Sequence, residues 1–216
     1  MIIPALLTTN KRIATERILL AREMSGWIHV DYIDHSLYKF ESLSLEDLSS
    51  LDFGEMAVEV HCMTDFPLKV LESDLPIDRL IIHVESKNWE KDYISAVNKG
   101  VDTWLAIDPF TPLASLQLPP DLSGVVMMGI EPGQMGQEFI SATYDRLLFI
   151  SEHYPDCSVT VDGGVGKENI RQLIAHGADN LVMGSAIFHQ THPVQAFRMY
   201  EHLSDPIGGA YDYQAA

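Results

Sequence analysis

Two histidines and two aspartates in this sequence close short apolar runs, at the points where buried strands should end. His29 and Asp31 end one such run. His61 ends a second run, and Asp162 ends a third. Side chains alternate between the two faces of a strand, so His29 and Asp31 point the same way. Because buried imidazoles and carboxylates need a partner or a cation, the pattern predicts a metal site with the ligands His29, Asp31, His61 and Asp162.

The chemistry of this ligand set leaves the identity of the metal open. Imidazole and carboxylate together suit one divalent ion (Zn²⁺, Fe²⁺, Mn²⁺ or Co²⁺), and they leave positions free for a chelating substrate. The alternative is that each histidine is a satisfied core residue and each aspartate caps the next helix. A further histidine, His83, ends the fourth run, where we expect a structural role.

The apolar runs that must position these residues recur along the chain. Eight of them begin near residues 2, 26, 55, 78, 101, 124, 157 and 180, and segments with helical character or charge lie between them. A repeat of roughly 20–30 residues is typical of a βα unit, and eight units predict a closed parallel (β/α)8 TIM barrel. We expect one α/β barrel domain over residues 1–203 and a tail over 204–216. In such a barrel the carboxyl ends of the strands, where the candidate ligands fall, form the reactive face.

The composition argues against two classes of partner. The 216 residues carry a formal net charge of −17, which repels nucleic acid and anionic lipid alike. No apolar run approaches the roughly 18–20 residues that a membrane span needs, and the N-terminus lacks the pattern of a secretion signal, so we expect a cytoplasmic protein. The two cysteines, Cys62 and Cys157, predict no disulfide framework, and we expect buried, inert thiols.

Glycine-containing turns follow the seventh and eighth runs. Gly163-Gly164 comes directly after the seventh run, and Gly184-Ser185 follows the eighth. Backbone N–H groups in such turns can approach an anion, and barrels often bind phosphate in these two loops, so we predict a phosphorylated small-molecule substrate. The alternative is two tight turns without a ligand. The stretch 131–137, with a proline and two glycines, predicts a loop that closes as a lid after the sixth strand.

These residues and several further motifs resemble the ribulose-phosphate 3-epimerase family, in the same order along nearly the whole chain. The motifs are Pro4-Ala5-Leu6-Leu7, His29-Val30-Asp31, Val60-His61-Cys62-Met63, His83-Val84-Glu85, Thr111-Pro112-Leu113, Pro132-Gly133-Gln134-Met135-Gly136-Gln137-Glu138-Phe139, Val161-Asp162-Gly163-Gly164 and Gly184-Ser185-Ala186-Ile187-Phe188. The resemblance implies a barrel whose metal is held by the four ligands named above, with Asp31 and Asp162 as catalytic residues that also move a proton. It further implies a set of substrate-binding residues, namely Thr8, His61, Met63, Met128, Gly133, Gln134, Met135, Gly136, Gly163, Gly164, Gly184 and Ser185.

The reaction that the resemblance implies is the interconversion of D-ribulose 5-phosphate and D-xylulose 5-phosphate at carbon 3. Two carboxylates on opposite faces of that carbon would take and return the proton in either direction. The metal would stabilise the enediolate that forms between the two proton transfers. The resemblance also implies a homo-oligomer.

Departures from the family's pattern leave the identity of the substrate sugar open. Residues 33–40 read IDHSLYKF where the family usually has a loop with glycine and proline, Thr8 replaces a usual serine, and Glu131 replaces a usual asparagine. Gln134-Met135 stands where an aromatic and a small residue are common. One alternative is therefore an epimerase of a hexulose 6-phosphate such as D-allulose 6-phosphate, and another is a non-catalytic barrel that binds a phosphosugar. A third, a decarboxylase or lyase, usually has a lysine beside its acid, and none closely follows Asp31.

Overall fold

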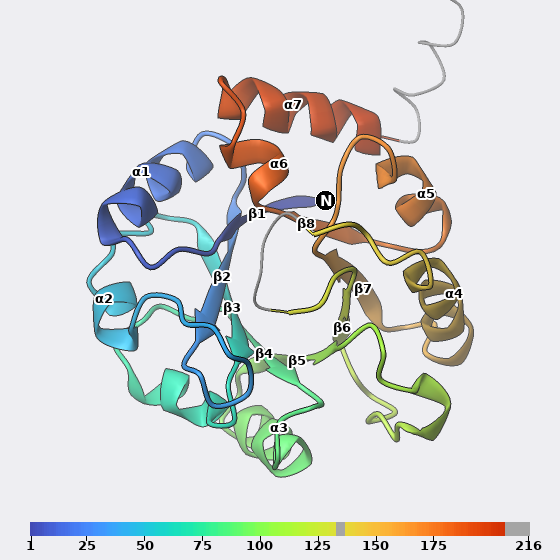
Figure 1. Cartoon of the computed structure of the whole chain (residues 1–216). Coiled ribbons are helices and arrows are strands. Elements are labelled where there is room, and N and C mark those ends of the chain that lie inside the picture. Colours follow the sequence, from blue (N-terminus) through green and yellow to red (C-terminus); the bar gives the residue numbers. More distant parts are fainter. Residues whose placement is uncertain (133–136, 206–216) are drawn as a thin grey trace, which may run out of the picture.

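The computed structural model describes residues 1–132 and 137–205, and within them eight parallel strands close into a barrel with helices outside it (Figure 1). Each strand pairs with the next in sequence, and the eighth pairs back with the first. The predicted single-domain (β/α)8 barrel is therefore confirmed. The strands are β1 (Ile2–Leu6), β2 (Trp27–Ile33), β3 (Ala57–Met63), β4 (Arg79–His83), β5 (Asp102–Ile107), β6 (Gly124–Met128), β7 (Ser158–Asp162) and β8 (Asn180–Met183).

The connections between the strands are mostly helical. They contain α1 (Lys11–Ala21), α2 (Leu45–Ser49), the 3-10 helix η1 (Pro67–Glu72), α3 (Trp89–Asn98), the 3-10 helix η2 (Leu113–Ser115), α4 (Thr143–His153), α5 (Ile170–Ala175), α6 (Ser185–Phe188) and α7 (Pro193–Ser204). The side chain of Asn10 accepts hydrogen bonds from the N–H groups of Arg12 and Ile13, which caps α1. Buried Ala14 and Ile18 then turn one face of α1 toward the sheet.

The alternation of side chains divides the strands into an outer and an inner face. Outward side chains such as Val58, Val60 and Leu80 join the main apolar cluster between the sheet and the helices. The inner face carries two smaller apolar clusters, formed by Ile81, Trp104, Ala106, Val126 and Met128 and by Ile3, Ala5 and Val182. Buried polar side chains also lie on this face, and they are His29, Asp31, Glu59, His61 and His83. The interior of the barrel is therefore largely apolar, and most of its buried polar groups come from β2, β3 and β4.

Two helices begin several residues after the rim of the barrel. α4 begins at Thr143, after Phe139, and α5 begins at Ile170, after Gly166. Phe139 lies against the glycine turns: its Cα is 2.9 Å from the position that a Cβ on Gly164 would occupy, and its ring is 2.8 Å from the corresponding position on Gly129. The segment before α4 is thus held by packing against the rim, which delays the start of the helix.

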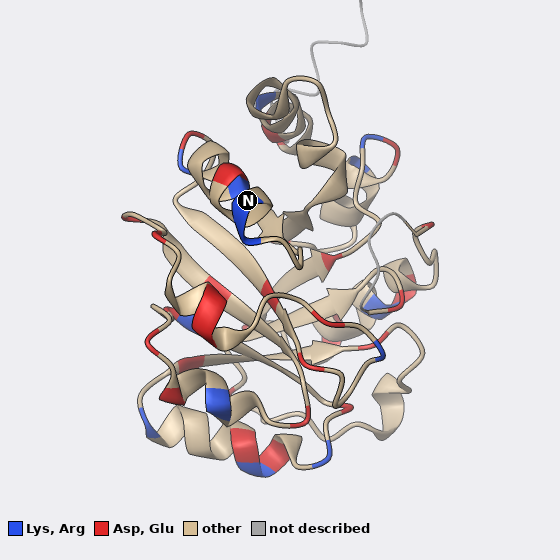
Figure 2. Ribbon diagram, turned by 60° about the vertical axis from the view of Figure 1, so that its left-hand side comes forward, with Lys and Arg blue, Asp and Glu red and all other residues tan. Residues whose placement is uncertain are grey.

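Acidic residues are spread over several helices and loops, which fits a solvated acidic surface (Figure 2). None of the helices within residues 1–132 and 137–205 combines the length and the apolar character that crossing a membrane requires. The predicted lid residues 133–136 and most of the predicted tail, 206–216, lie outside the described residues.

Candidate metal centre and active-site cavity

Four predicted ligands come together inside the barrel. Nε2 of His29 lies 3.1 Å from Nδ1 of His61. Oδ1 of Asp31 is 3.4 Å from the first of these nitrogens and 3.1 Å from the second. Oδ2 of Asp162 is 3.6 Å from Nε2 of His29 and 3.3 Å from Nδ1 of His61. Strands β2, β3 and β7 therefore bring two nitrogens and two oxygens to one point, although 130 residues of the chain lie between Asp31 and Asp162.

This arrangement fits a divalent cation. The five separations given above lie between 3.1 and 3.6 Å, which is close to the edges of a regular tetrahedron. A tetrahedron of that size has its centre about 2.0 Å from each corner, which is the distance that zinc keeps from nitrogen and oxygen ligands. Two carboxylates also balance the charge of a divalent ion, so the donor set suits such an ion in charge as well as in size.

At this centre, neighbouring opposite charges shift the pKa values of the buried groups against the effect of burial. Burial alone would lower the pKa of His29, but hydrogen bonds to Asp31 and Glu59 and the charge of Asp162 raise this pKa well above its ordinary value. Burial alone would raise the pKa of Asp31, but hydrogen bonds from His29 and His61 bring this pKa below its ordinary value. Asp31 is therefore ionised at neutral pH and can accept a proton.

A second layer of residues orients His29. Its Nδ1 lies 2.6 Å from Oε1 of Glu59, which is buried in the middle of β3. Oε2 of Glu59 accepts a hydrogen bond of 2.8 Å from Arg79, and the guanidinium of Arg79 lies 4.5 Å from the ring centre of Trp27 and 3.7 Å from that of Trp104. A carboxylate on the far nitrogen of a ligand histidine sets which ring nitrogen carries the proton. Glu59 was not predicted from the sequence, although a charged residue two positions before His61 in an apolar strand was a signal for it.

His61 also has a partner on its far nitrogen. Its Nε2 lies 2.7 Å from Nε2 of His83, and the two rings stack with 4.8 Å between their centres. Burial alone would lower the pKa of His83, but hydrogen bonds to Asp108 and Glu85 raise this pKa to about 9. The structural role that we expected for His83 thus includes direct contact with His61, a predicted metal ligand.

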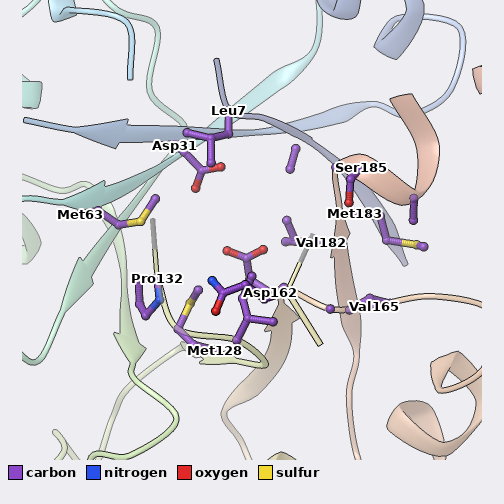
Figure 3. Close-up of a pocket in the computed structure, with 17 residues that line it drawn as sticks. Leu7, Asp31, Met63, Met128, Pro132, Asp162, Val165, Val182, Met183 and Ser185 are labelled. Carbon is purple, nitrogen blue, oxygen red and sulfur yellow. The ribbon is translucent and has the colours of Figure 1, made fainter. Parts of the chain in front are cut away.

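A cavity opens above the candidate metal centre at the carboxyl ends of the strands (Figure 3). The side chains of Asp31 and Asp162 point toward one another across it, and Met63 and Met128 lie on one side. The lining residues are Ala5, Leu7, Asp31, Met63, Met128, Ile130, Pro132, Gln137, Asp162, Gly163, Gly164, Val165, Val182, Met183, Gly184, Ser185 and Ala186. Both acid–base candidates therefore face a space that can hold a small molecule.

Most of the described substrate-binding candidates lie in this lining, and two lie outside it. His61 is buried beneath the cavity in the metal centre, and the hydroxyl of Thr8 accepts a hydrogen bond from the N–H group of Asn10. The lining also includes Ile130, which was not predicted from the sequence, and Pro132 and Gln137 from the predicted lid segment. Gly133, Gln134, Met135 and Gly136 are outside the described residues. Among the residues that the structure describes, the divergent segment 33–40 contributes nothing to the lining.

Gly163 shows why the predicted phosphate turn needs glycine. Its φ is +94°, a conformation that side chains with a Cβ rarely adopt. A Cβ at this position would lie 2.3 Å from Cγ1 of Ile130, well inside contact distance. The backbone of the turn can therefore approach the cavity only because the side chain is absent.

Replacing Gly163 with alanine is expected to destabilise the protein by about 2–4 kcal/mol, because positive φ and a steric clash each cost on the order of 1–3 kcal/mol. The midpoint of thermal unfolding should fall by about 5–15 °C in a chain of this size. The matched control is Gly166→Ala in the same loop, where a Cβ meets nothing within 4 Å. Equal unfolding midpoints for the two variants would contradict this account of the turn.

Both thiols are buried, as the sequence analysis expected. Burial raises the pKa of the Cys157 thiol to about 11. Burial raises the pKa of Cys62 further, in the middle of β3. Both sulfurs are therefore protonated at neutral pH, and we assign neither of them a role in the chemistry.

Residues 1–188 match the sequence model of the Ribulose-phosphate 3 epimerase family. Among curated proteins, the ribulose-phosphate 3-epimerase of Buchnera aphidicola is 30% identical over 191 residues, covering 81% of this chain and 83% of that protein. The protein of the same name from Chlamydia trachomatis is 32% identical over 174 residues, covering 76% and 75% of the two chains. A rice protein named as the cytoplasmic isoform is 26% identical and covers 89% of each chain.

Solved structures with the same fold have more distant sequences. A 3-hexulose-6-phosphate synthase from Salmonella typhimurium superposes with a TM-score of 0.67 at 13% identity, covering 94% of this chain and 97% of the other. An orotidine 5'-phosphate decarboxylase from Pyrococcus horikoshii gives a TM-score of 0.61 at 15% identity, with coverage of 94% and 99%. At such identities the likeness shows the barrel fold alone.

Proposed function

Because the chain belongs to the ribulose-phosphate 3-epimerase family and is therefore an isomerase that acts on carbohydrates, we propose that it interconverts D-ribulose 5-phosphate and D-xylulose 5-phosphate. The observation that carries this proposal is the placement of Asp31 and Asp162 on facing sides of one cavity, directly above two histidines. Inversion at a carbon next to a ketone needs this geometry, since one face loses a proton and the opposite face gains one. A barrel that only binds a sugar phosphate would not need two carboxylates on opposite sides of its cavity.

Asp31 and Asp162 are the proposed acid–base pair. The pKa of Asp31 is below its ordinary value, so this carboxylate is ionised and ready to take the proton from carbon 3 in one direction. Asp162 would deliver a proton to the other face, and the two residues would exchange roles in the reverse direction. Met63 and Met128 provide an apolar, polarisable wall beside the reacting carbon, which limits access of water to the enediolate.

His29, Asp31, His61 and Asp162 are the residues that would hold a divalent metal ion. When bound, the ion supplies Lewis-acid stabilisation of the negative charge that develops on the substrate oxygens. The chain contributes the orientation of the ligands, with Glu59 behind His29 and His83 behind His61. These ligands suit zinc, iron, manganese and cobalt, and elemental analysis of protein purified without added metal identifies the ion.

The turns at Gly163-Gly164 and Gly184-Ser185 form the proposed phosphate end of the cavity. They line the side of the cavity supplied by β7 and β8, where barrels commonly bind phosphate with backbone N–H groups. A net charge of −17 repels an anionic substrate, so binding depends on these local dipoles and on the cation. The substrate would then lie with its phosphate at these turns and carbon 3 between the two aspartates.

The proposal is tested by measuring turnover of D-ribulose 5-phosphate by the purified, metal-loaded protein. D-allulose 6-phosphate in the same assay tests which sugar is the substrate. We expect the pentulose to give the higher kcat/KM, together with solvent deuterium at the inverted carbon. A higher kcat/KM for the hexulose would keep the chemistry and change the substrate. Turnover of neither sugar would overturn both epimerase hypotheses. A cytoplasmic location is part of the proposal, supported by the rice relative's name.

A further inference from the structure

Tyr38, in the divergent segment 33–40, reaches a polar cluster at the ends of β4 and β5. Its hydroxyl donates a hydrogen bond of 2.6 Å to Oδ1 of Asp108 and lies 3.0 Å from Nδ1 of His83. The same nitrogen is 3.0 Å from Oε2 of Glu85 and 3.2 Å from Oδ1 of Asp108. Burial and the charge of Asp108 raise the pKa of Tyr38 above its ordinary value, so the phenol keeps its proton. The cluster therefore surrounds one side of the His83 ring.

The other side of the His83 ring faces His61. Nδ1 of His61 is the nitrogen that lies among the predicted metal ligands, and Nε2 is the nitrogen 2.7 Å from Nε2 of His83. A ring nitrogen that binds a cation uses its lone pair, so a neutral His61 carries its proton on Nε2. With a cation on Nδ1 of His61, Nε2 of His83 must accept that proton's hydrogen bond, so in this state His83 is neutral and carries its own proton on Nδ1, although its pKa is raised in the metal-free protein. That proton points at the carboxylates of Asp108 and Glu85.

We propose that Tyr38, Asp108 and His83 form a positioning relay that holds His61 in the tautomer and ring orientation required for metal binding. This inference rests on the metal centre of the proposed function. It assigns the divergent segment 33–40 a role through His61, since the segment contributes no described residue to the lining of the cavity. Glu59 and Arg79 support His29 in the same way, so both ligand histidines have a buried partner.

The carboxylates of the cluster already accept hydrogen bonds, which favours a relay over a second cation site. The N–H group of Asp108 donates a hydrogen bond of 3.0 Å to Oε1 of Glu85, and the hydroxyl of Thr111 donates to the same oxygen. Arg146 donates to the backbone oxygens of Asp108 and Thr111 at 2.9 and 2.7 Å, and its charge lies near both carboxylates of the cluster. A cation here would displace Tyr38 from Asp108 and face the charge of this guanidinium.

The relay is tested by titrating the metal-free protein with Co²⁺ and following visible absorption, which reports both affinity and ligand geometry. Replacement of a residue that supports a ligand histidine typically weakens metal binding by about 10–100-fold, and we expect this for His83→Leu, with a changed cobalt spectrum. His83→Gln keeps an acceptor for His61 and should recover most of the affinity. Tyr38→Phe should weaken binding by about threefold to tenfold, because Asp108 and Glu85 still orient His83.

The matched control is Tyr93→Phe, which removes the hydroxyl of a buried tyrosine on α3, outside the cluster. If His83→Leu does not fold, Tyr38→Phe decides, and a cobalt affinity within about twofold of the control overturns the relay. Binding of two cobalt ions by the parent protein, one of them lost in Glu85→Gln, would also overturn it. These readouts need no substrate, so a protein that shows the relay effect but epimerises neither sugar would overturn the proposed function alone.

Discussion

Replacing Asp162 with asparagine is expected to reduce kcat for epimerisation by about 10³-fold while the protein stays folded. A positioned general acid or base contributes about 10²–10⁴ in rate, and Asp162 is proposed as one of the only two carboxylates that transfer the proton. The amide has nearly the shape of the carboxylate, and the side chain is 14% exposed, so the change creates neither a cavity nor an unpaired buried charge. The matched control is Asp145→Asn, at an exposed position of α4.

Solvent exchange separates the two aspartates more sharply than the loss of turnover does. In Asp162→Asn, Asp31 can still remove a proton from one epimer and return it to the same face. That epimer should therefore take up solvent deuterium without inversion, and Asp31→Asn should do the same with the other epimer. The experiment is mass spectrometry of each sugar after incubation in deuterium oxide, with the metal content of each variant measured because both aspartates are predicted ligands.

Two results would contradict the assignment. Deuterium in both epimers with either single variant would mean that one carboxylate serves both faces. Inversion at the parent rate by Asp162→Asn would exclude this residue from proton transfer, whatever its part in binding the metal. A third result would support the assignment. If Asp162→Asn loses its metal, and excess metal refills the site without restoring turnover, then Asp162 transfers a proton in addition to binding the metal.

The strands and the four predicted ligands could be derived from the sequence because both depend on local pattern. A buried strand of a parallel barrel is a short apolar run, and a polar residue at its end stands out against that run. The observed strands begin within two residues of the predicted starts, at Ile2, Trp27, Ala57, Arg79, Asp102, Gly124, Ser158 and Asn180. Closure of the barrel then brings the ends of β2, β3 and β7 together without further information.

The relay could not be derived in this way, because it depends on where a loop lies after the barrel closes. Tyr38 and Asp108 are 70 residues apart, and the contact between them requires segment 33–40 to lie against the ends of β4 and β5. The loss of glycine from this segment suggested an altered loop. His35, in the position of that glycine, nevertheless has a φ of +65°, so the backbone keeps a conformation that glycine favours. Its side chain lies 3.1 Å from Glu41, which helps to hold the turn.

Complete removal of divalent metal is expected to abolish epimerisation, with a loss of at least about 10³-fold in kcat. A carboxylate such as Asp31 is far too weak a base to hold a proton taken from carbon, so charge on the intermediate must be stabilised. Lewis-acid stabilisation is worth several kcal/mol, and each 1.36 kcal/mol changes the rate about tenfold. The measurement is kcat after dialysis against a chelator, followed by readdition of Zn²⁺, Mn²⁺, Co²⁺ or Fe²⁺.

The ligand set also predicts which metals restore activity. One equivalent of zinc or cobalt should suffice, because the two imidazoles of His29 and His61 favour these ions. Mg²⁺ should restore far less at the same concentration, since it prefers oxygen ligands and octahedral geometry. Full activity with less than about one metal ion per ten chains would overturn the metal-dependent mechanism while leaving the family assignment in place.

Metal binding should also raise thermal stability, because the site exists only in the folded chain. A ligand at about 100 times its Kd stabilises the folded state by about 2.7 kcal/mol, which corresponds to a rise of about 5–10 °C for a domain of this size. In the double variant His29→Ala/His61→Ala the added metal should no longer shift the unfolding midpoint. A shift that persisted in this variant would place the stabilising ion elsewhere, and the cluster of His83, Glu85 and Asp108 would be the next site to test.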